Sequence, residues 1–367
     1  MTRAFVVPPL FVVPPLGGTA RCIQTDFRLK AGLRTRTRGF TLLEMVVVVA
    51  ILAVLATIAI KSVDGRIDQA RYETTQRQLQ EIGDAILGPQ NLRQPDGSLM
   101  ASGFVSDLGR MPKALDDDGD STTPLQPQEL WANPGALASF SIRQATNTIA
   151  GVTNITSAMS FTFDSGTGTF SALTTTTILT IDDPTILVPC GWRGPYLRLA
   201  PGDTSLKDGW GNAFILLQSD GATNAVANSE FAQVGTLGAD AAAGGSGYDA
   251  DVKLIVVDTA SSQDRYLASI SGTLDTTALG SGSSSSPISV RLYGPDPATG
   301  KVACFEQTLP AGTLAFVFPA TIGTTTVSTI GARVLRAVQV AGASTVSSKV
   351  LNVVVPQGGL SGITLKF

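Results

Sequence analysis

The feature that most constrains this chain is a single apolar run, Phe40–Ile60, close to its N-terminus. As an α-helix its 21 residues would extend about 31 Å, enough to cross a bilayer core of about 30 Å. The run is longer than the apolar region of a secretory signal peptide, and no small-residue cleavage site follows it. No second run of this length occurs in the sequence. We therefore expect one membrane-spanning helix.

One carboxylate, Glu44, lies inside this apolar run. A charged carboxylate at mid-membrane costs about 2.5–3.5 kcal/mol on insertion scales, so such a residue is expected to be functional and to need a partner. The run itself holds no cation. The simplest partner is the α-amino group of a neighbouring copy, which requires a cut just before Phe40.

The residues around Glu44 resemble the processing site shared by type IV prepilins and type II secretion pseudopilins. Gly39 is followed by Phe40, and Glu44 would be the fifth residue of the mature chain. The resemblance implies cleavage after Gly39 by prepilin peptidase, methylation of the Phe40 amine and packing of the 40–60 helices into a homo- or hetero-filament. It also implies other pilin or pseudopilin subunits and an inner-membrane assembly platform as partners.

Charge orients the expected membrane segment. Residues 1–39 carry a net charge of +6, and the remainder of the chain carries −9. The basic leader 1–39 stays cytoplasmic by the positive-inside rule. Together with this orientation, the resemblance implies a single-pass inner-membrane protein with its body in the periplasm and, after assembly, in a cell filament. An acidic body argues against nucleic-acid binding.

Beyond Ile60 the apolar pattern becomes amphipathic. Apolar residues recur three or four positions apart, or at multiples of that spacing, up to the breaker pair Gly88-Pro89. They are Val63, Ile67, Ala70, Leu79, Ile82 and Ile86. Because no cap or breaker separates residues 60 and 61, we expect one helix, Phe40–Leu87, with a membrane-spanning part 40–60 and an amphipathic part 61–87.

Two turns that each present a tryptophan follow, in segments 191–197 and 206–214. Together and in this order they resemble the body signature of the type II secretion major pseudopilin, the closest resemblance within the family. It implies a small antiparallel-sheet pilin body. Gly209 stands where that family usually has proline, so we expect a less rigid turn there.

A glycine-rich loop, 237–252, has carboxylates at both ends. Calcium takes six to eight oxygen ligands, and flexible glycine backbone lets carbonyls turn inward. The loop resembles the calcium loop of major pseudopilins, which implies side-chain ligands at Asp240 and Asp251 and a carbonyl ligand at Leu237. Asp249 is an extra carboxylate whose part is open, and a solvated acidic loop is the alternative. A second acidic cluster, 116–120, fails the EF-hand spacing and is expected to be solvated.

The remaining stretches are additional to a pilin. Residues 90–189 form an insertion rich in threonine, serine and asparagine, and 265–367 contains five or more short alternating strands. The expected class is α+β, ending in an immunoglobulin-like or transthyretin-like β-sandwich. The expected domains are a cleaved leader 1–39, helix 40–60, helix 61–87, a pseudopilin-like body with insertion 88–258, and a sandwich 259–367.

Two cysteines, Cys190 and Cys304, remain after the leader is removed, and they fall in different expected domains. The oxidising side of the membrane permits a disulfide, and whether they pair is open at this point. The chain has no histidine, which excludes Ser-His-Asp and Cys-His catalysis and histidine-ligated zinc. No catalytic residue is predicted, and we expect a non-enzyme.

Two functions compete. The first is a structural pseudopilin subunit that polymerises through its N-terminal helix. The second is a minor pilin or tip adhesin, whose C-terminal β domain binds a surface, sugar or secreted partner while the helix incorporates it.

Overall fold

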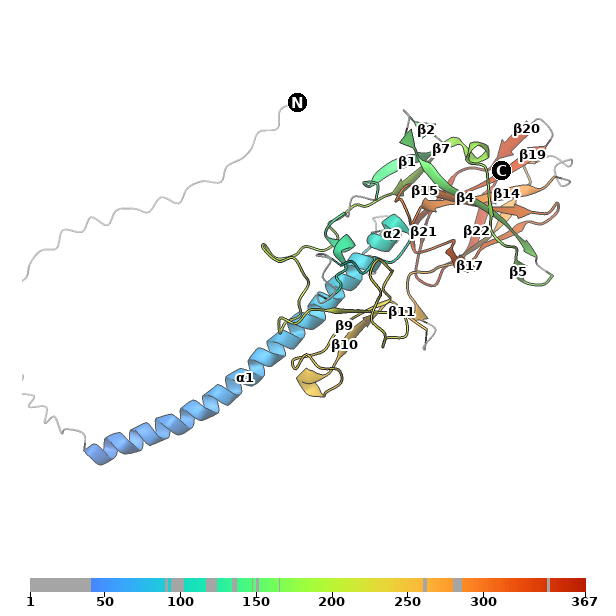
Figure 1. The fold of residues 1–367 in the computed structure, drawn as a ribbon. Helices are drawn as coiled ribbons and strands as arrows, with labels where there is room; N and C mark the ends of the chain where they lie inside the picture. Colours follow the sequence, from blue (N-terminus) through green and yellow to red (C-terminus); the bar gives the residue numbers. More distant parts are fainter. Residues whose placement is uncertain are drawn as a thin grey trace, which may run out of the picture. The chain divides into compact units, whose positions relative to one another are not determined.

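The computed structural model describes residues 41–89, 92–93, 102–116, 124–133, 137–146, 148–149, 152–164, 166–259, 263–279, 286–341 and 344–367. The chain divides into two units, Met1–Ile60 and Lys61–Phe367. The class is α+β, with few helices and many strands in several sheets (Figure 1). The expected leader, with Gly39 and Phe40, lies outside the described residues.

The long helix α1 spans Leu42–Leu87, which confirms the predicted N-terminal helix and its end. Gly88 follows with a φ of +82°, a left-handed conformation that suits glycine. A side chain could not replace it, because a Cβ there would lie 2.2 Å from the Ser102 carbonyl oxygen. The left-handed conformation of Gly88 therefore ends the helix.

The last third of α1 is packed against the body. Its buried stripe begins at Thr75 and continues through Leu79, Ile82 and Ile86. Ile67, which the amphipathic pattern places on the same face, is exposed. The pattern thus predicted the packed face correctly from Leu79 onward and extended it too far toward the N-terminus.

A three-stranded antiparallel sheet, ordered β10-β9-β8, packs beside this part of α1. Its strands are β8 Ile215–Leu217, β9 Gln233–Thr236 and β10 Val252–Ile255. Leu254 packs closely at Gly83, where an added Cβ would lie 3.3 Å from Leu254 Cδ1. This sheet, α1 and the two tryptophan turns contribute to one core cluster.

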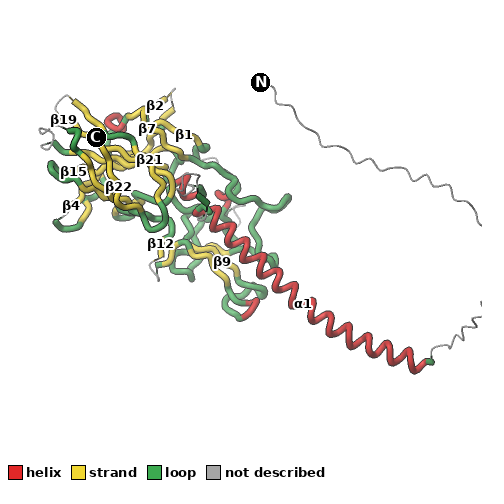
Figure 2. Tube along the Cα trace, turned by 180° about the vertical axis from the view of Figure 1, so that it is seen from behind, coloured by secondary structure: helices red, strands yellow, loops and turns green. Residues whose placement is uncertain are grey.

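Strands and loops make up most of the chain beyond α1 (Figure 2). Within the described residues, the largest sheet has eight strands, ordered β20-β19-β14-β15-β4-β5, with β21 also paired to β19 and β6 to β4. Its strands are β4 Ile155–Asp164, β5 Thr169–Phe170, β6 Thr174–Thr175, β14 Ile288–Pro295, β15 Val302–Leu309, β19 Gly331–Ala341, β20 Ser344–Ser347 and β21 Leu351–Val355.

A second sheet, ordered β16-β13-β22, shares a core with one face of the large sheet. Its strands are β13 Ile270–Asp275, β16 Ala315–Phe318 and β22 Leu360–Lys366. Leu292 and Leu335 of the large sheet and Phe316 of the second sheet are buried in this core. Residues 265–367 are therefore β-rich, as expected.

The structure does not confirm the expected immunoglobulin-like or transthyretin-like sandwich. The β4–β15 and β13–β22 pairs are parallel, whereas immunoglobulin sheets are antiparallel. Parallel partners need a long crossover, and the chain between β4 and β15 supplies one. In addition, β4 belongs to the expected insertion 90–189, so the large sheet crosses the expected boundary between 258 and 259.

A two-stranded ribbon of β1 Ser141–Ala145 and β7 Asp183–Cys190 covers the other face of the large sheet. Ile186 and Val188 pack there against Tyr293 and Val334 in a second core cluster. Arg336 of β19 forms an ion pair with Asp183, which holds the ribbon at the sheet. The insertion thus supplies three strands of the large sheet, β4, β5 and β6, and nearly all of the ribbon that covers it.

The other elements are short. They are α2 Phe104–Leu108, the 3-10 helices Gln128–Leu130, Ile178–Ile181 and Gly247–Asp249, and the strands β2 Thr148–Ile149, β3 Val152–Thr153, β11 Val257–Asp258, β12 Gln263–Asp264, β17 Thr321–Ile322 and β18 Thr325–Thr326.

Candidate functional site

The start of α1 carries a capping box formed by Thr41 and Glu44. The Thr41 backbone N–H donates to Glu44 Oε2 at 2.9 Å, and the Glu44 N–H donates to Thr41 Oγ1 at 3.2 Å. This reciprocal arrangement satisfies two donors at the helix start. Glu44 therefore has a hydrogen-bond partner, Thr41, in its own chain. This partner is not a cation. The Thr-x-x-Glu spacing is the signal that identifies it.

Apolar side chains surround this first part of α1. Leu42 is 84% exposed and Ile58 62% exposed, and those between them are also exposed. Within the residues that the structure describes, no helix combines the length and the hydropathy of a membrane span.

The second tryptophan turn docks directly on α1 through Gly209. The Gly209 N–H donates to Thr75 Oγ1 at 2.9 Å, and a Cβ on Gly209 would lie 2.2 Å from the Arg71 carbonyl oxygen. A proline, the usual residue in the resembled family, would lack this donor and meet the helix backbone. The absence of a side chain at Gly209 lets the turn approach the helix. The expectation of a less rigid turn did not include these contacts with α1.

A buried carboxylate, Asp208, fixes the shape of the same turn. Its Oδ1 accepts hydrogen bonds from the Trp210 and Asn212 N–H groups, and its Oδ2 accepts one from Thr236 Oγ1. The Asn212 side chain in turn donates to the Gly238 carbonyl at 2.9 Å. The turn is therefore joined to the start of the glycine-rich loop.

Aromatic contacts join the helix to both segments. The Tyr72 ring of α1 lies edge-on to Trp210, with centroids 6.4 Å apart, and to Tyr248 of the glycine-rich loop, with centroids 6.0 Å apart. Sequence reasoning singled out Trp210 but gave no role to Tyr72, whose helical spacing carries no signal for this contact.

The first tryptophan turn holds α2. Arg193 forms an ion pair with Asp107 at 2.9 Å, and the Tyr196 hydroxyl donates to the same carboxylate at 3.0 Å. Burial raises the Asp107 pKa to about 6, against the opposing effect of the Arg193 charge. The Trp192 Nε1 donates to the Glu129 carbonyl. These contacts indicate a structural turn.

The glycine-rich loop is ordered by its own backbone contacts. Asp240 Oδ1 accepts from the Ala242 N–H at 3.0 Å, and Asp251 Oδ1 accepts from the Gly244 N–H at 3.2 Å. Asp249 is exposed, and Leu237 is half-buried. The described residues contain no group of three or more acidic or cysteine side chains arranged to hold a metal ion. Any calcium site here would therefore depend on backbone carbonyls as well as on Asp240 and Asp251.

The other predicted positions are located as follows. Of the acidic cluster 116–120, only Asp116 lies within the described residues. Cys190 and Cys304 are buried and have free thiols, and they belong to one core cluster. Their titratable neighbours differ: Arg143 faces Cys190, whereas Arg291 and Tyr293 face Cys304. Burial raises the pKa of both thiols, to about 12 for Cys190.

Comparison with known proteins bears on the N-terminal segment. Residues 34–60 match the family model of the prokaryotic N-terminal methylation motif. This match supports a type IV prepilin-like protein. The prepilin-like motif implies processing by prepilin peptidase and assembly with other pilin subunits, and it suggests a structural role and membrane anchoring. No curated protein and no solved structure matches the chain.

Proposed function

We propose that this prepilin-like chain is a pseudopilin-like structural subunit, which polymerises through helix 40–60 into a filament of the type II secretion or type IV pilus kind. The methylation motif at residues 34–60 carries the proposal, because it marks the pilin-like subunits of such filaments. The docking of the second tryptophan turn on α1 favours the secretion pseudopilin, whose body signature that turn resembles.

Assembly would use Glu44 in two ways. Before assembly, the carboxylate caps the helix through Thr41. In the filament, it would pair with the Phe40 amine of a neighbouring copy, which offsets the cost of a carboxylate in the membrane. The single-pass precursor would sit in the inner membrane with its body in the periplasm.

Processing gives the first test. We expect the mature chain to begin at Phe40 with a methylated amine, because Gly39-Phe40 and Glu44 together form the processing signal. Mass spectrometry of the N-terminal peptide from membrane-extracted protein measures this directly. A start at Met1, or a cut after Ile60, would overturn the pilin interpretation.

A second candidate function is a minor pilin or tip adhesin. The observation that favours it is the size of the β structure, whose large sheet alone has eight strands. A β structure of this size would add bulk to every subunit of a filament, so it suits a subunit that is present in few copies. Subunit stoichiometry in purified filaments separates the two: a main subunit dominates, whereas a tip subunit appears in trace amounts. Neighbouring genes for a secretin and a secretion ATPase would favour the pseudopilin.

We also propose that loop 237–252 binds calcium through Asp240, Asp251 and backbone carbonyls such as that of Leu237. Asp251 already reaches across the loop to Gly244, which supports a closed oxygen-rich site. A metal that binds only the folded state adds RT ln(1 + [L]/Kd), about 2.7 kcal/mol at a hundredfold excess over Kd.

Thermal unfolding of the chain in millimolar calcium tests this proposal. The melting temperature should rise, and Asp240→Ala and Asp251→Ala should each remove the rise. Magnesium should give less, because it demands octahedral geometry and retains its waters. Asp116→Ala is the matched control and should respond like wild type. Equal melting in calcium and in chelator would refute the site.

A further inference from the structure

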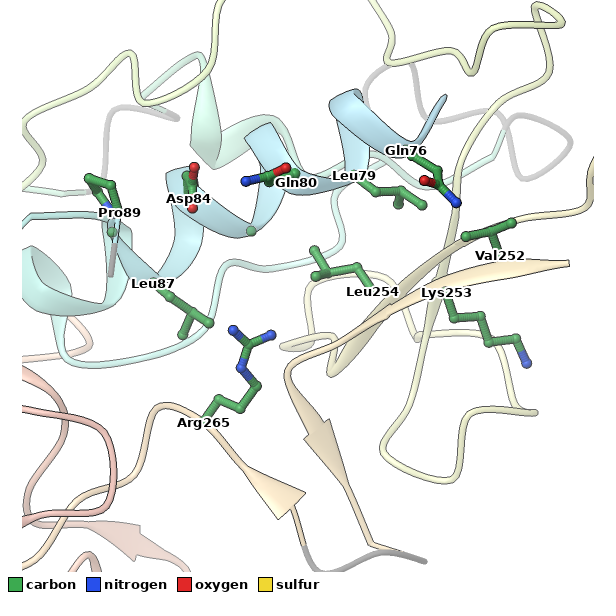
Figure 3. Close-up of a pocket in the computed structure, with 12 residues that line it drawn as sticks. Gln76, Leu79, Gln80, Asp84, Leu87, Pro89, Val252, Lys253, Leu254 and Arg265 are labelled. Carbon is green, nitrogen blue, oxygen red and sulfur yellow. The ribbon is translucent and has the colours of Figure 1, made fainter. Parts of the chain in front are cut away.

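A groove lies between the C-terminal part of α1 and strand β10 (Figure 3). Its cavity measures about 480 Å³. Leu79 of the helix and Val252 and Leu254 of the strand give it an apolar floor. Asp84 lies along the helix side, and the Arg265 guanidinium lies at one end, near Leu87 (Figure 3).

The strand beside this groove has an open edge. β10 is the end strand of the sheet β10-β9-β8, and no described strand pairs with its outer side. The Val256 N–H donates toward β9, to the Ala232 carbonyl at 3.2 Å. Because peptide groups alternate sides along an antiparallel strand, those of Ile255 and Lys253 face the open edge. Consistent with this, the Ile255 carbonyl accepts from Arg265 Nη1 at 3.2 Å.

The cation at the end of the groove completes the site. Among the described residues, the Arg265 side chain forms no salt bridge and donates one hydrogen bond, to the Ile255 carbonyl. The Arg265 backbone N–H donates separately to the Val256 carbonyl at 3.0 Å. A guanidinium has five donors in a fork that matches a carboxylate. A half-buried arginine at the end of a groove with an apolar floor therefore favours a ligand that brings a carboxylate.

We propose that this groove binds an extended peptide segment of a partner protein, which adds a fourth strand beside β10 and pairs its carboxylate with Arg265. Strand addition supplies backbone hydrogen bonds, and pockets for alternate side chains supply specificity. The helix from Gln76 to Leu87 extends about 16 Å, the length of about five extended residues. Every contact used lies within Lys61–Phe367, so the proposal does not depend on filament assembly.

The probe is a fluorescein-labelled, C-terminally amidated pentapeptide, Thr-Val-Thr-Val-Glu, titrated against the full chain in detergent by fluorescence anisotropy. We expect saturable binding. Lys253→Pro removes an N–H on the open edge without removing a bond to β9, so it should weaken binding about tenfold or more. Lys253→Ala is the matched control, because it keeps the N–H and should bind like wild type.

The arginine is tested separately. Arg265→Gln should weaken binding of the Glu peptide about tenfold and leave the weaker binding of a Gln-ended peptide unchanged. Melting temperatures of all variants must stay near wild type.

Three results would overturn the proposal. They are no saturable binding to wild type, equal binding by Lys253→Pro, and equal binding of a peptide whose alternate nitrogens are methylated. A dimer that Lys253→Pro dissolves, without peptide binding, would assign the groove to a second copy instead.

Discussion

At the scale of single residues, Gly209 and Glu44 differ in how far apart in the sequence their contacts lie. The contact of Gly209 with the Arg71 carbonyl joins residues 138 positions apart. No local sequence pattern predicts that contact. The partner of Glu44, in contrast, is three residues away and readable from sequence.

Gly209→Ala should destabilise the body by about 2 kcal/mol or more, because its Cβ must displace the helix backbone or the turn. Urea unfolding followed by tryptophan fluorescence measures the change. Gly65→Ala is the control: Gly65 lies exposed in α1 with nothing within 4 Å of an added Cβ, so alanine should stabilise by up to about 1 kcal/mol. Equal stability of the two variants would contradict the docking role of Gly209.

At the scale of elements, α1 was the most predictable part of the fold. Its end at Leu87 is predicted by local features of the sequence, the apolar periodicity and the pair Gly88-Pro89. Such features do not depend on contacts between distant parts of the chain. The two tryptophan turns were also visible, although their contacts with Thr75 and Tyr72 were not. The β4–β15 pair could not be predicted, because a parallel pair joins distant segments and leaves no turn signal between them.

Variants at the start of α1 can separate the effect of the Glu44 charge from the effect of helix capping. Glu44→Gln keeps an acceptor for the Thr41 N–H but loses the charge, since glutamine also serves at this capping position. Glu44→Val loses both, and Thr41→Ala loses mainly the cap. If Glu44 pairs with a neighbouring amine, Gln and Val variants should insert into the membrane yet fail equally to enter filaments. Shear and pull-down assays measure incorporation. Normal incorporation of Glu44→Gln would assign Glu44 to capping alone.

At the scale of the whole molecule, the large sheet joins the insertion to the C-terminal stretch. β4 and the β1–β7 ribbon precede the second tryptophan turn in sequence, whereas β14, β15 and β19 follow the glycine-rich loop. The pilin-like turn and loop therefore lie, in sequence, between two parts of one β structure.

A chain that ends at Asp258 should accordingly fail to fold. It would leave β4 without β15, and Ile186 and Val188 without Tyr293 and Val334. We expect loss of a cooperative thermal transition and increased binding of a hydrophobic dye, compared with the full chain. A truncated chain that melts cooperatively near the wild-type temperature would instead restore a separate domain 259–367.

The β4–β15 pairing also determines how long β4 must wait for its partner strand during synthesis. Ile155 and its partner Val302 are 147 residues apart. At about 5–20 residues per second, synthesis of the intervening chain takes about 7–30 s. During that interval β4 has no β15 to pair with, and its alternating apolar residues are open to pairing with other chains. Non-local parallel pairing is also slow once both strands exist. The interval between making β4 and making β15 is thus when the nascent chain most needs a chaperone.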